Sequence, residues 1–566
     1  MVGKRSVKAA EIRGYIKTRC QLSVSAKEIF DELCVVHGQN EVSYATVTRW
    51  IKKFNSGCDS INVHQIRDVL VVLLLTLWLT NGMVYTAYIV SFMLRHVAIP
   101  FVLFVTCKTL WKWYVTSTRD STCSLPLPPG GYGLPFIGET IHMLILGKAY
   151  FENRRKEYGD VYKTHLLGKP TIRVIGAEGV KQILRGENTI VQTQWPVSTC
   201  ILLGEGAISH AVGDSHITKK RAIMKAFTFD ALSRYLPVIQ ETTRKYIRRW
   251  CQTKRILGYK QFKTMNFDLS CRLMIGFQGN ETECQNLMQI FETFISNIFC
   301  IPVDIKGSGF RKALQARDIL LQKIDEVIQD RQGHEDADAS DVLTTILNAR
   351  SSHDLTISGV KNFCLELLFA GHGTTSSAAA FLVYVLAKHP EVVRKLKDEF
   401  EAFGVLDETN IDTDLKKLNK MTYLNNVVKE LLRLSPPVGG GFRKAIKTFE
   451  VNGYQVPKGW AVTYAIRDTH EVSEHFEDAT EFKPERWENF FVKNNQFLYL
   501  PFGGGRRACA GKDLARLMLK IFALELVKGC EWSLENDIAE FETFPMPHPK
   551  DGLPLLFKSS AQYSES

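Results

Sequence analysis

The segment that decides how this sequence is interpreted is Phe502-Gly503-Gly504-Gly505-Arg506-Arg507-Ala508-Cys509-Ala510-Gly511. It fits the pattern F-x-x-G-x-R-x-C-x-G, which defines five positions in ten residues. Glycines before the cysteine let the backbone pass close to a flat ligand, because they carry no Cβ. A helical pattern opens just after Cys509, so the sulfur lies near a helix N-terminus, where the dipole and free amides favour the thiolate. Cys509 is therefore the candidate metal ligand of this chain.

The segment resembles the cysteine-ligand loop of the cytochrome P450 superfamily. This resemblance implies haem b (iron protoporphyrin IX) as the cofactor and Cys509 as the thiolate ligand of its iron. It also implies that Phe502 and Gly505 lie against the cofactor and that Arg507 pairs with a haem propionate, for which a planar guanidinium is well suited.

Two further residues are expected at the haem by the same resemblance. In the wider superfamily a tryptophan and, four residues later, an arginine reach the propionates. Here His216 and Lys220 occupy those places, and both can still form hydrogen bonds with carboxylates.

A charged network is expected N-terminal to the cysteine segment. Glu430-Leu431-Leu432-Arg433 resembles the E-x-x-R of the family's K helix, and Pro484-Glu485-Arg486-Trp487 resembles the element that supplies a third partner. Taken alone, such a pair is more often an exposed contact of a few tenths of a kcal/mol. In this order before the cysteine segment, the residues predict a buried Glu430–Arg433–Arg486 network that supports the haem pocket.

A long helix is predicted from Ser358, its candidate N-cap, to Lys388, with His389-Pro390 as the stop. Near its middle, Ala370-Gly371-His372-Gly373-Thr374-Thr375 resembles the family's I-helix motif, in which small residues, an acid and a threonine lie over the haem. Two glycines and two threonines are poor helix formers, so a turn is expected to open there. Thr374 is the candidate catalytic residue.

One departure from the family concerns the acid of that motif. The family usually has Asp or Glu just before the threonine, whereas this chain has Gly373. Proton delivery usually needs an acid as well as a hydroxyl. Three readings remain open: water and Thr374 suffice, with help from His372; oxygen activation is impaired; or the enzyme rearranges lipids without splitting oxygen.

The resemblance runs from about Leu125 to the C-terminus and is greatest to the retinoic-acid-hydroxylating P450s. The matching stretches include Leu125–Gly130, Phe136–Thr140, Tyr162–Leu166, Trp195-Pro196, Asn297–Asp304, Gly440–Arg443 and Asn452–Trp460. The family's P-V-P-G-G-F-R is here Pro437-Val438-Gly439-Gly440-Gly441-Phe442-Arg443, which leaves the regiochemistry open.

A retinoid pocket is implied by that resemblance, with Trp195, Phe299, Ala370 and Phe442 as its lining. Large apolar side chains suit a polyene, since ligand sites are mostly apolar with few polar anchors. The alternative for the aromatic residues is a role in the core. Sterols and other terpenoids remain alternative substrates.

Electrons must come from another protein, because the sequence contains no visible flavin or nicotinamide motif. Lys512, Arg516 and Lys520 are spaced to share one helix face, and Arg506 is near. Such a basic patch suits an acidic flavoprotein, so we expect NADPH–cytochrome P450 reductase as partner. A plain solvated face is the alternative.

The composition fits a large, mainly helical protein. The chain has 566 residues, 45% of them hydrophobic, and a formal net charge of +11, which suits an anionic partner of any kind. Its 13 cysteines form no C-x-x-C pair and are expected to be reduced thiols of a cytosol-facing protein. Strand-like pieces at Lys163–His165, Thr171–Ile175 and Ala461–Ile466 predict a minor β part.

Four regions separate along the chain: an extension at 1–60, a membrane anchor at 69–107, a linker and proline-rich hinge at 108–130, and a catalytic domain at 131–566. Val69–Leu94 carries no charge and could span a membrane before Arg95 and His96 interrupt it. A buried core helix is the alternative. Lys, Arg and Trp in the residues that follow predict the catalytic domain on the cytosolic side of the endoplasmic reticulum membrane.

Residues 1–57 lie outside the P450 pattern. Helices are predicted at Ser25–Val36 and Ser43–Phe54, with a turn at His37–Asn40 between them. This resembles the first helix-turn-helix of mariner-type transposases, whose second helix can enter a major groove. A DNA-binding protein is thus a distant alternative. We do not expect a nucleic-acid partner, because a membrane-tethered oxidase has no evident use for DNA, and we interpret the extension as transposon-derived.

Overall fold

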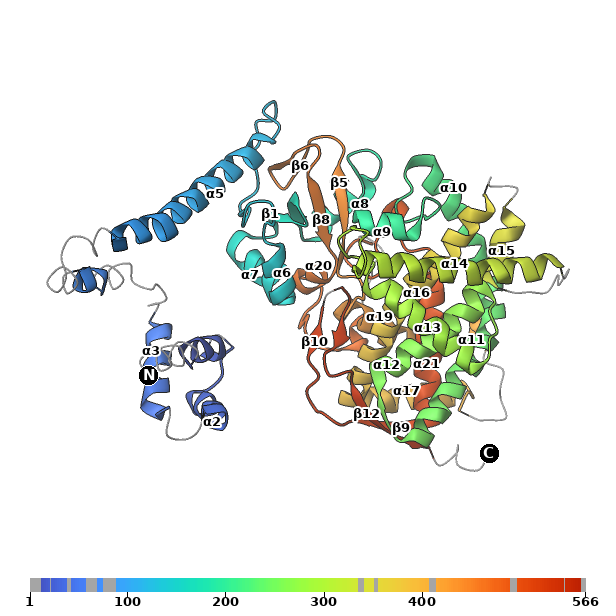
Figure 1. The fold of residues 1–566 in the computed structure, drawn as a ribbon. Coiled ribbons are helices and arrows are strands. Elements are labelled where there is room, and N and C mark those ends of the chain that lie inside the picture. The colour runs from blue at the N-terminus through green and yellow to red at the C-terminus, as the bar shows by residue number, and fades with distance from the viewer. Residues whose placement is uncertain are drawn as a thin grey trace. The chain divides into compact units, whose positions relative to one another are not determined.

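The computed structural model describes residues 12–20, 22–37, 42–56, 69–74, 88–333, 341–350, 355–406, 414–488, 496–543 and 545–560. They belong to two compact units, residues 1–109 and 110–566. Figure 1 shows the elements of both units along the chain.

In the first unit, two helices pack on a small apolar core. They are α2 (Ala26–His37) and α3 (Tyr44–Asn55), so both predicted helices are present with a shift of one residue. Ser43 caps α3, because its hydroxyl accepts a hydrogen bond from the Thr46 amide at 3.2 Å. The core consists of Ile16, Ile29, Leu33, Val42 and Val47. Most of the predicted turn, residues 38–40, lies outside the described residues.

An apolar helix follows. Tyr88–Ser117 is long and apolar enough to cross a membrane by length and composition. It contains the π-helical turn η1 (Leu94–Ala98) and α5 (Ile99–Ser117). Arg95 and His96, which interrupt the apolar run of the sequence, lie in this π turn, and the helix continues through them. The helix also continues beyond Cys107, into the range assigned to the linker, while residues 75–87 of the predicted span lie outside the described part.

The second unit begins with the end of α5 and a segment that is fixed to the domain. Trp460 Nε1 donates to Thr118 Oγ1 at 2.9 Å, and the buried side chain of Gln455 accepts from the Asp120 amide at 3.1 Å. The Lys163 amide donates to Pro129 O at 2.8 Å. The proline-rich stretch is therefore bonded to strands on either side of it.

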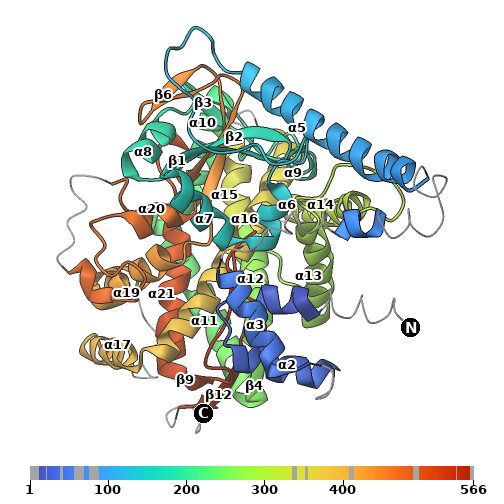
Figure 2. The same cartoon turned by 90° about the vertical axis from the view of Figure 1, so that its left-hand side faces the viewer.

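Helices make up most of the second unit, and Figures 1 and 2 show them gathered below the larger sheet. The longer helices in chain order are α7 (Lys148–Tyr158), α8 (Ala177–Arg185), α10 (Gly213–Met224), α11 (Phe229–Thr253), α12 (Gly258–Ser270), α13 (Glu281–Ser296), α14 (Gly309–Gly333), α15 (Val342–Ala349), α16 (Ile357–Lys388), α17 (Pro390–Ala402), α19 (Thr422–Leu434) and α21 (Lys512–Gly529). The shorter helices are α6 (Thr140–Leu146), α9 (Val197–Leu203), α18 (Leu415–Lys420) and α20 (Arg467–Val472).

The strands form a minor part, as predicted. The largest sheet has the order β1-β2-β8-β5-β3 and consists of β1 (Val161–Leu166), β2 (Lys169–Val174), β8 (Ala461–Ala465), β5 (Gly440–Ala445) and β3 (Val191–Thr193). Only the β2–β8 pair in this sheet is parallel. The smaller sheets comprise β4 (Arg255–Leu257), β12 (Pro554–Ser559) and β9 (Cys530–Leu534), then β6 (Phe449–Val451) with β7 (Tyr454–Val456), and β10 (Phe541–Glu542) with β11 (His548–Pro549).

The helix α16 lies at the centre of the main hydrophobic core, packed against α12, α14 and α21. Its N-cap is Thr356, whose hydroxyl accepts from the Gly359 amide at 3.0 Å, so the prediction of Ser358 as the cap is wrong. Ser358 already lies in the first turn. The helix ends at Lys388 before His389-Pro390, as predicted, because proline cannot continue the hydrogen-bond pattern.

Candidate active site

The cysteine segment is an irregular loop that leads into α21. Gly503 and Gly505 have left-handed backbone angles, with φ of +66° and +64°. A Cβ at Gly505 would lie 2.3 Å from the carbonyl oxygen of Leu184 at the end of α8, so this turn requires glycine. The Cys509 amide donates to Phe502 O at 3.0 Å and closes the loop.

The thiol of Cys509 has protein groups on several sides. Burial raises its pKa, while the Gly511 amide, which donates to the sulfur, and the nearby Lys220 ammonium oppose that rise. The side chain nevertheless keeps accessible surface. The sulfur is thus open to a ligand although charged and polar groups of the protein lie near it.

Lys220 supports the same loop from α10. Its Nζ donates to the carbonyl oxygens of Arg506 and Ala508, each at 2.7 Å, which leaves a third N–H of the ammonium for another partner. His216 lies one turn earlier on α10 and is buried. Burial, with Arg507, Lys220 and Arg443 nearby, lowers the pKa of His216 to about 4, so its ring is neutral at neutral pH.

Arg507 binds a short backbone segment and one carboxylate. Its Nε donates to Glu187 Oε1 at 3.0 Å, and its Nη1 donates to the carbonyl oxygens of Ile208 and Ser209 at 3.3 and 3.2 Å. Its Nη2 also donates to the carbonyl of Ala211. The segment 208–211 thus has a fixed position beside the cysteine loop.

The same segment is held from the other side by α16. The carboxylate of Glu366 accepts from the amides of Ile208 and Ser209 at 2.6 and 2.7 Å, and burial raises its pKa. Ala370 and Thr374 follow Glu366 at successive intervals of four residues, so they lie on the same helix face. Ala370 is accessible within an otherwise buried stretch of the helix. This face of α16 and Arg507 therefore meet at the same backbone segment.

The middle of α16 is a regular helix. Thr374 Oγ1 donates to the carbonyl oxygen of Ala370 at 2.6 Å, and the α-helix runs without a break from Ile357 to Lys388. The predicted opening of a turn is thus absent from the structure. The Thr374 hydroxyl therefore makes its hydrogen bond within α16. Serine and threonine commonly donate in this way to the carbonyl four residues back.

His372 points away from Thr374. Its Nε2 lies 3.1 Å from the carbonyl oxygen of Lys263 on α12 and 3.8 Å from Glu292 Oε1, and its ring packs edge-on against Phe267 and Phe291. Burial lowers its pKa to about 3. Residues two apart on a helix do not share a face, so the suggestion that His372 directly helps Thr374 finds no support in the geometry.

Gly373 is packed against a methionine. A Cβ built at Gly373 would lie 2.5 Å from the terminal methyl carbon of Met546 and 3.4 Å from its sulfur. Met546 thus fills the space into which a side chain at position 373 would extend. Because the clash is with the flexible end of a methionine, a larger residue there requires that side chain to move.

The predicted pocket residues lie on segments that are bonded to the ends of β3, β5 and α9. Trp195 Nε1 donates to Ser209 O at 3.1 Å, and Phe442 lies on β5 next to Arg443, which pairs with Thr193 of β3. Phe299 follows Ile298, whose carbonyl oxygen accepts from the Ser198 and Thr199 hydroxyls of α9, just after Trp195. Phe299 and Phe442 both remain accessible, at 44% and 40%.

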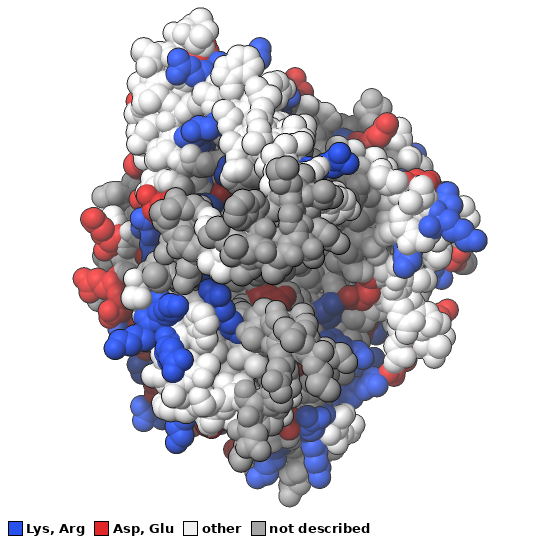
Figure 3. All heavy atoms as spheres, turned by 60° about the vertical axis from the view of Figure 1, so that its left-hand side comes forward, with Lys and Arg blue, Asp and Glu red and all other residues white. Residues whose placement is uncertain are grey.

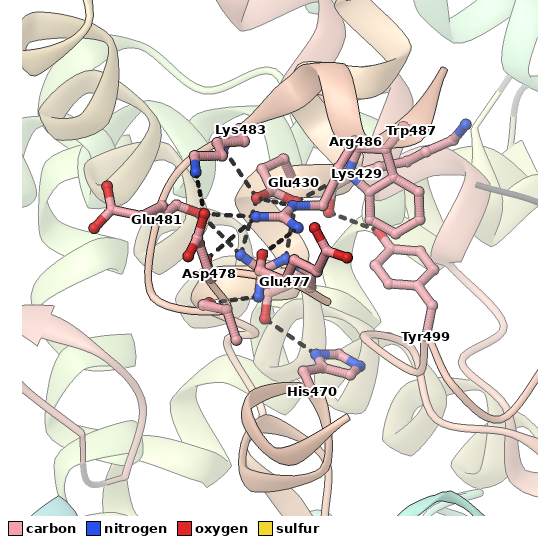
Figure 4. Close-up of polar contacts among 12 residues, drawn as sticks. Lys429, Glu430, His470, Glu477, Asp478, Glu481, Lys483, Arg486, Trp487 and Tyr499 are labelled. Atoms are coloured by element: carbon pink, nitrogen blue, oxygen red, sulfur yellow. Dashed lines mark hydrogen bonds and ion pairs between the residues drawn. The ribbon is translucent and has the colours of Figure 1, made fainter. Parts of the chain in front are cut away.

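The structure also brings together the predicted charged network (Figure 4). Glu430 and Arg433 are fully buried, with Glu430 accepting from Arg433 Nε at 2.8 Å and from Arg486 Nε at 2.8 Å. Trp487 Nε1 donates to Glu430 Oε2 at 3.0 Å. Arg433 and Arg486 donate further to backbone carbonyls between residues 477 and 481.

A histidine connects this network to the cysteine segment. His470 Nδ1 lies 3.0 Å from the carbonyl oxygen of Arg433 (Figure 4). Its Nε2 accepts from the Leu500 amide at 2.9 Å. Burial lowers the pKa of His470 to about 4, so the neutral ring can accept that bond. Leu500 stands two residues before Phe502, so the network is bonded to the start of the loop.

The predicted basic patch is only partly exposed. Arg506 is exposed and Lys512 and Arg516 are half-buried, but Lys520 is buried and donates to Asn419 Oδ1 at 3.1 Å. Burial, followed by the charges of Arg516 and Lys429, lowers the pKa of Lys520 to about 8. The prediction of Lys520 on an open face is wrong, because α21 is surrounded by other elements from this residue onward.

Two residues of the predicted patch, Arg516 and Lys520, line a cleft of about 470 Å³. Lys429, Arg516 and Lys520 meet there with one carboxylate, Asp513. On the face drawn in Figure 3, Lys and Arg lie in separate groups interspersed with Asp, Glu and uncharged surface. The charge of this chain is therefore not one continuous field on that face.

At this site the cationic side chains outnumber the carboxylate groups that contact them. Arg443, Arg507 and Lys220 surround the loop, and Glu187 contacts both guanidiniums. Arg443 Nε lies 2.9 Å from Glu187 Oε2 but has no well-aligned hydrogen-bond acceptor. An accessible thiol beside surplus guanidinium charge fits a flat metal-bearing group with carboxylates. Among the described residues there is no cluster of three or more His, Cys, Asp or Glu that could hold a metal ion.

Glu187, Glu366 and the role of Arg443 were not predicted from the sequence. Each acts through contacts between distant segments, and neither carboxylate stands in a recognisable motif. Arg443 was visible at the end of the matching stretch Gly440–Arg443, which is the one signal that could have identified it.

Comparison with known proteins identifies relatives of most of the chain. Residues 128–554 match the family model described as "Cytochrome P450", and residues 10–58 match that of the "HTH domain in Mos1 transposase". Cytochrome P450 26A1 of Gallus gallus is 41% identical over 470 residues, covering 81% of this chain and 96% of the relative. Cytochrome P450 26B1 of Homo sapiens is 39% identical over 466 residues, covering 80% and 91%. The solved structure of a retinoic-acid-bound cyanobacterial CYP120A1 is 34% identical, with a TM-score of 0.70, and covers 77% of this chain and all of that one.

Proposed function

This chain belongs to the cytochrome P450 family, and we propose that it is a haem-thiolate monooxygenase that hydroxylates retinoic acid, using dioxygen and electrons from NADPH. The observation that carries the proposal is the accessible Cys509 thiol in a loop held by Lys220 and the glycine turns, beside the buried guanidinium of Arg507.

Haem b is the proposed cofactor, and it supplies the activation of dioxygen for insertion of one oxygen atom into a C–H bond. Cys509 provides the thiolate, and the Gly511 amide donates to the sulfur. Arg507, His216 and Lys220 are the proposed propionate partners. Phe502 and Gly505 are proposed to lie against the ring, where the glycine turn keeps the loop close to a flat surface.

Retinoic acid is proposed as the substrate because the relatives that match most of the chain are cytochromes P450 26A1 and 26B1, and because the proposed pocket residues are apolar. Trp195, Phe299, Ala370 and Phe442 supply a mainly hydrophobic lining, which suits a polyene. The solved structure of the similar cyanobacterial protein holds retinoic acid. The match to the Gallus gallus relative, at 41% identity, covers 96% of that relative. Another terpenoid or a sterol would fit the same apolar chemistry.

Thr374 is proposed to hold a proton at Oγ1 on the substrate side of α16. Its hydroxyl already donates to Ala370 O, so proton movement at this atom requires that bond to break or to be shared with water. The neighbouring position, Gly373, contributes no acid.

The proposed electron donor is NADPH–cytochrome P450 reductase. Lys429, Arg516 and Lys520 line a cleft with surplus positive charge, and Arg506 of the cysteine segment is exposed. Such a cleft accepts an acidic side chain of a partner. The helix Tyr88–Ser117 is proposed to anchor the enzyme in the endoplasmic reticulum membrane, with residues 131–566 as the catalytic domain in the cytosol.

The proposed function is tested with the full-length protein in membranes. The reduced protein under carbon monoxide should show the absorption band of a thiolate-ligated haem. With NADPH and the reductase, all-trans retinoic acid should be consumed with formation of a hydroxylated product. A normal carbon monoxide band with no retinoid product, but with turnover of a sterol, would replace the substrate and keep the enzyme class.

The second candidate is a P450 that rearranges lipids without cleaving oxygen. The observation in its favour is Gly373, where Met546 fills the position of an acid. Product formation from a lipid hydroperoxide without NADPH or reductase would favour this candidate over the monooxygenase.

A further inference from the structure

Glu187 lies between two buried guanidinium groups. It follows α8 directly, and its Oε1 accepts from Arg507 Nε at 3.0 Å and from the Thr193 amide at 3.2 Å. Its Oε2 lies 2.9 Å from Arg443 Nε. The side chains of Glu187, Arg443 and Arg507 are 1%, 7% and 8% exposed, so solvent screens these contacts only weakly.

Three different parts of the fold meet at this carboxylate. Arg443 comes from β5, Arg507 from the cysteine segment, and Glu187 from the turn between α8 and β3. Removal of the carboxylate would leave two neighbouring buried guanidiniums without the group that joins them. An uncompensated buried charge is costly, so their side chains would separate or recruit water.

We propose that Glu187 is a positioning residue that fixes Arg443 and Arg507 and partly offsets their charge, and that it thereby sets the reduction potential of the haem. This inference rests on the proposed function, since it requires a haem whose propionates face these guanidiniums. Reduction adds an electron to the haem, so nearby uncompensated positive charge favours the reduced state. Glu187 lowers the potential by cancelling part of that charge.

The test is a spectroelectrochemical titration of the purified full-length holoenzyme, with Glu187→Gln compared with the wild type. Glutamine has nearly the same shape and lacks the charge. We expect the midpoint potential of the variant to be more positive. Glu525→Gln is the matched control. Glu525 is equally buried and paired with Arg244, but it lies about 20 Å along α21 from the start of that helix. The midpoint potential of Glu525→Gln should equal that of the wild type.

A charge-balanced variant separates electrostatics from packing. Glu187→Gln combined with Arg443→Gln removes one charge of each sign, so its midpoint should return toward the wild-type value. A midpoint for Glu187→Gln that equals or lies below the wild-type value overturns the inference. So does a double variant that is as positive as the single one.

Glu187→Asp covers the case in which the glutamine variant fails to fold. Aspartate keeps the charge but is one methylene shorter, so the potential should stay near wild type while the guanidiniums are held less firmly. Haem transfer from this variant to apomyoglobin should then be faster than from the wild type. Unchanged transfer together with an unchanged potential overturns the inference. A wild-type protein without any carbon monoxide band would overturn the proposed function itself, which is a separate outcome.

Discussion

The cysteine segment Phe502–Gly511 and the middle of α16, Ala370–Thr375, differ in how their backbones are satisfied. The cysteine segment is irregular, so two of its carbonyl groups accept hydrogen bonds from an outside side chain, Lys220, and its Arg507 is held by Glu187. Its turn at Gly505 passes so close to Leu184 that only glycine fits. The middle of α16 satisfies its backbone within the helix, and even Thr374 donates to its own helix. In such an irregular loop, few residue types fit at each position. A regular helix accepts more residue types, and here it accepts Gly373.

The largest expected effect is at the cysteine. Cys509→Ala should abolish the thiolate-type carbon monoxide band and reduce retinoid turnover to background, because alanine offers no ligand to the iron. The matched control is Cys284→Ser, at a half-buried cysteine on α13 whose thiol donates to the Gly279 carbonyl. Retention of the band in Cys509→Ala would contradict the assignment of this segment.

A smaller but still large effect is expected in the network that supports the loop. Glu430→Gln should destabilise the protein by about 3–5 kcal/mol, because it leaves Arg433 buried without its carboxylate. Urea unfolding followed by tryptophan fluorescence measures this loss. Glu485→Gln serves as the control. Glu485 pairs with Lys395 and is half-exposed, so it should cost about 1 kcal/mol or less. Equal losses in the two variants would contradict a supporting role for the buried network.

These two regions also explain which features the sequence could predict. The cysteine loop and the Glu430 network use glycine, cysteine and charged residues at fixed short spacings, so they were readable. The contacts of Glu187 and Glu366 with segments far away in the chain have no such spacing and became visible only in the fold. The burial of Lys520 was missed for the same reason, since helical spacing identifies a face but not what packs on it.

The third prediction concerns the acid that α16 lacks. Gly373→Glu combined with Met546→Ala should raise the amount of hydroxylated product per NADPH consumed. The methionine has to be shortened because a Cβ at position 373 would lie 2.5 Å from its terminal carbon. We expect a gain of up to about tenfold, below the 10²–10⁴ typical of general acid–base catalysis, since in the proposed function the Thr374 hydroxyl already takes part in proton delivery.

The control for this effect is Gly373→Ala with Met546→Ala, which adds the same Cβ and opens the same space without a carboxyl group. Product per NADPH should then stay close to the wild-type ratio. If the glutamate and alanine variants have equal ratios, the missing acid does not limit coupling. The comparison between the two regions would then lose its functional meaning at Gly373.

The smallest effect is expected at His372, which points to the face of α16 that lies opposite Thr374. His372→Leu should leave product per NADPH unchanged, because the ring contacts Lys263 O and two phenylalanines rather than Thr374. At neutral pH the loss of that hydrogen bond should cost about 1 kcal/mol of stability.

The burial that lowers the pKa of His372 to about 3 makes the unfolded chain bind more protons than the native one below pH 6.5. Native stability therefore falls as the pH drops from 6.5 toward 3, and removal of His372 should make that fall less steep. It should not disappear, since His216 and His470 also have pKa values lowered to about 4. Urea unfolding across this pH range measures the slope, and a marked drop in coupling at neutral pH would instead make His372 part of the proton path.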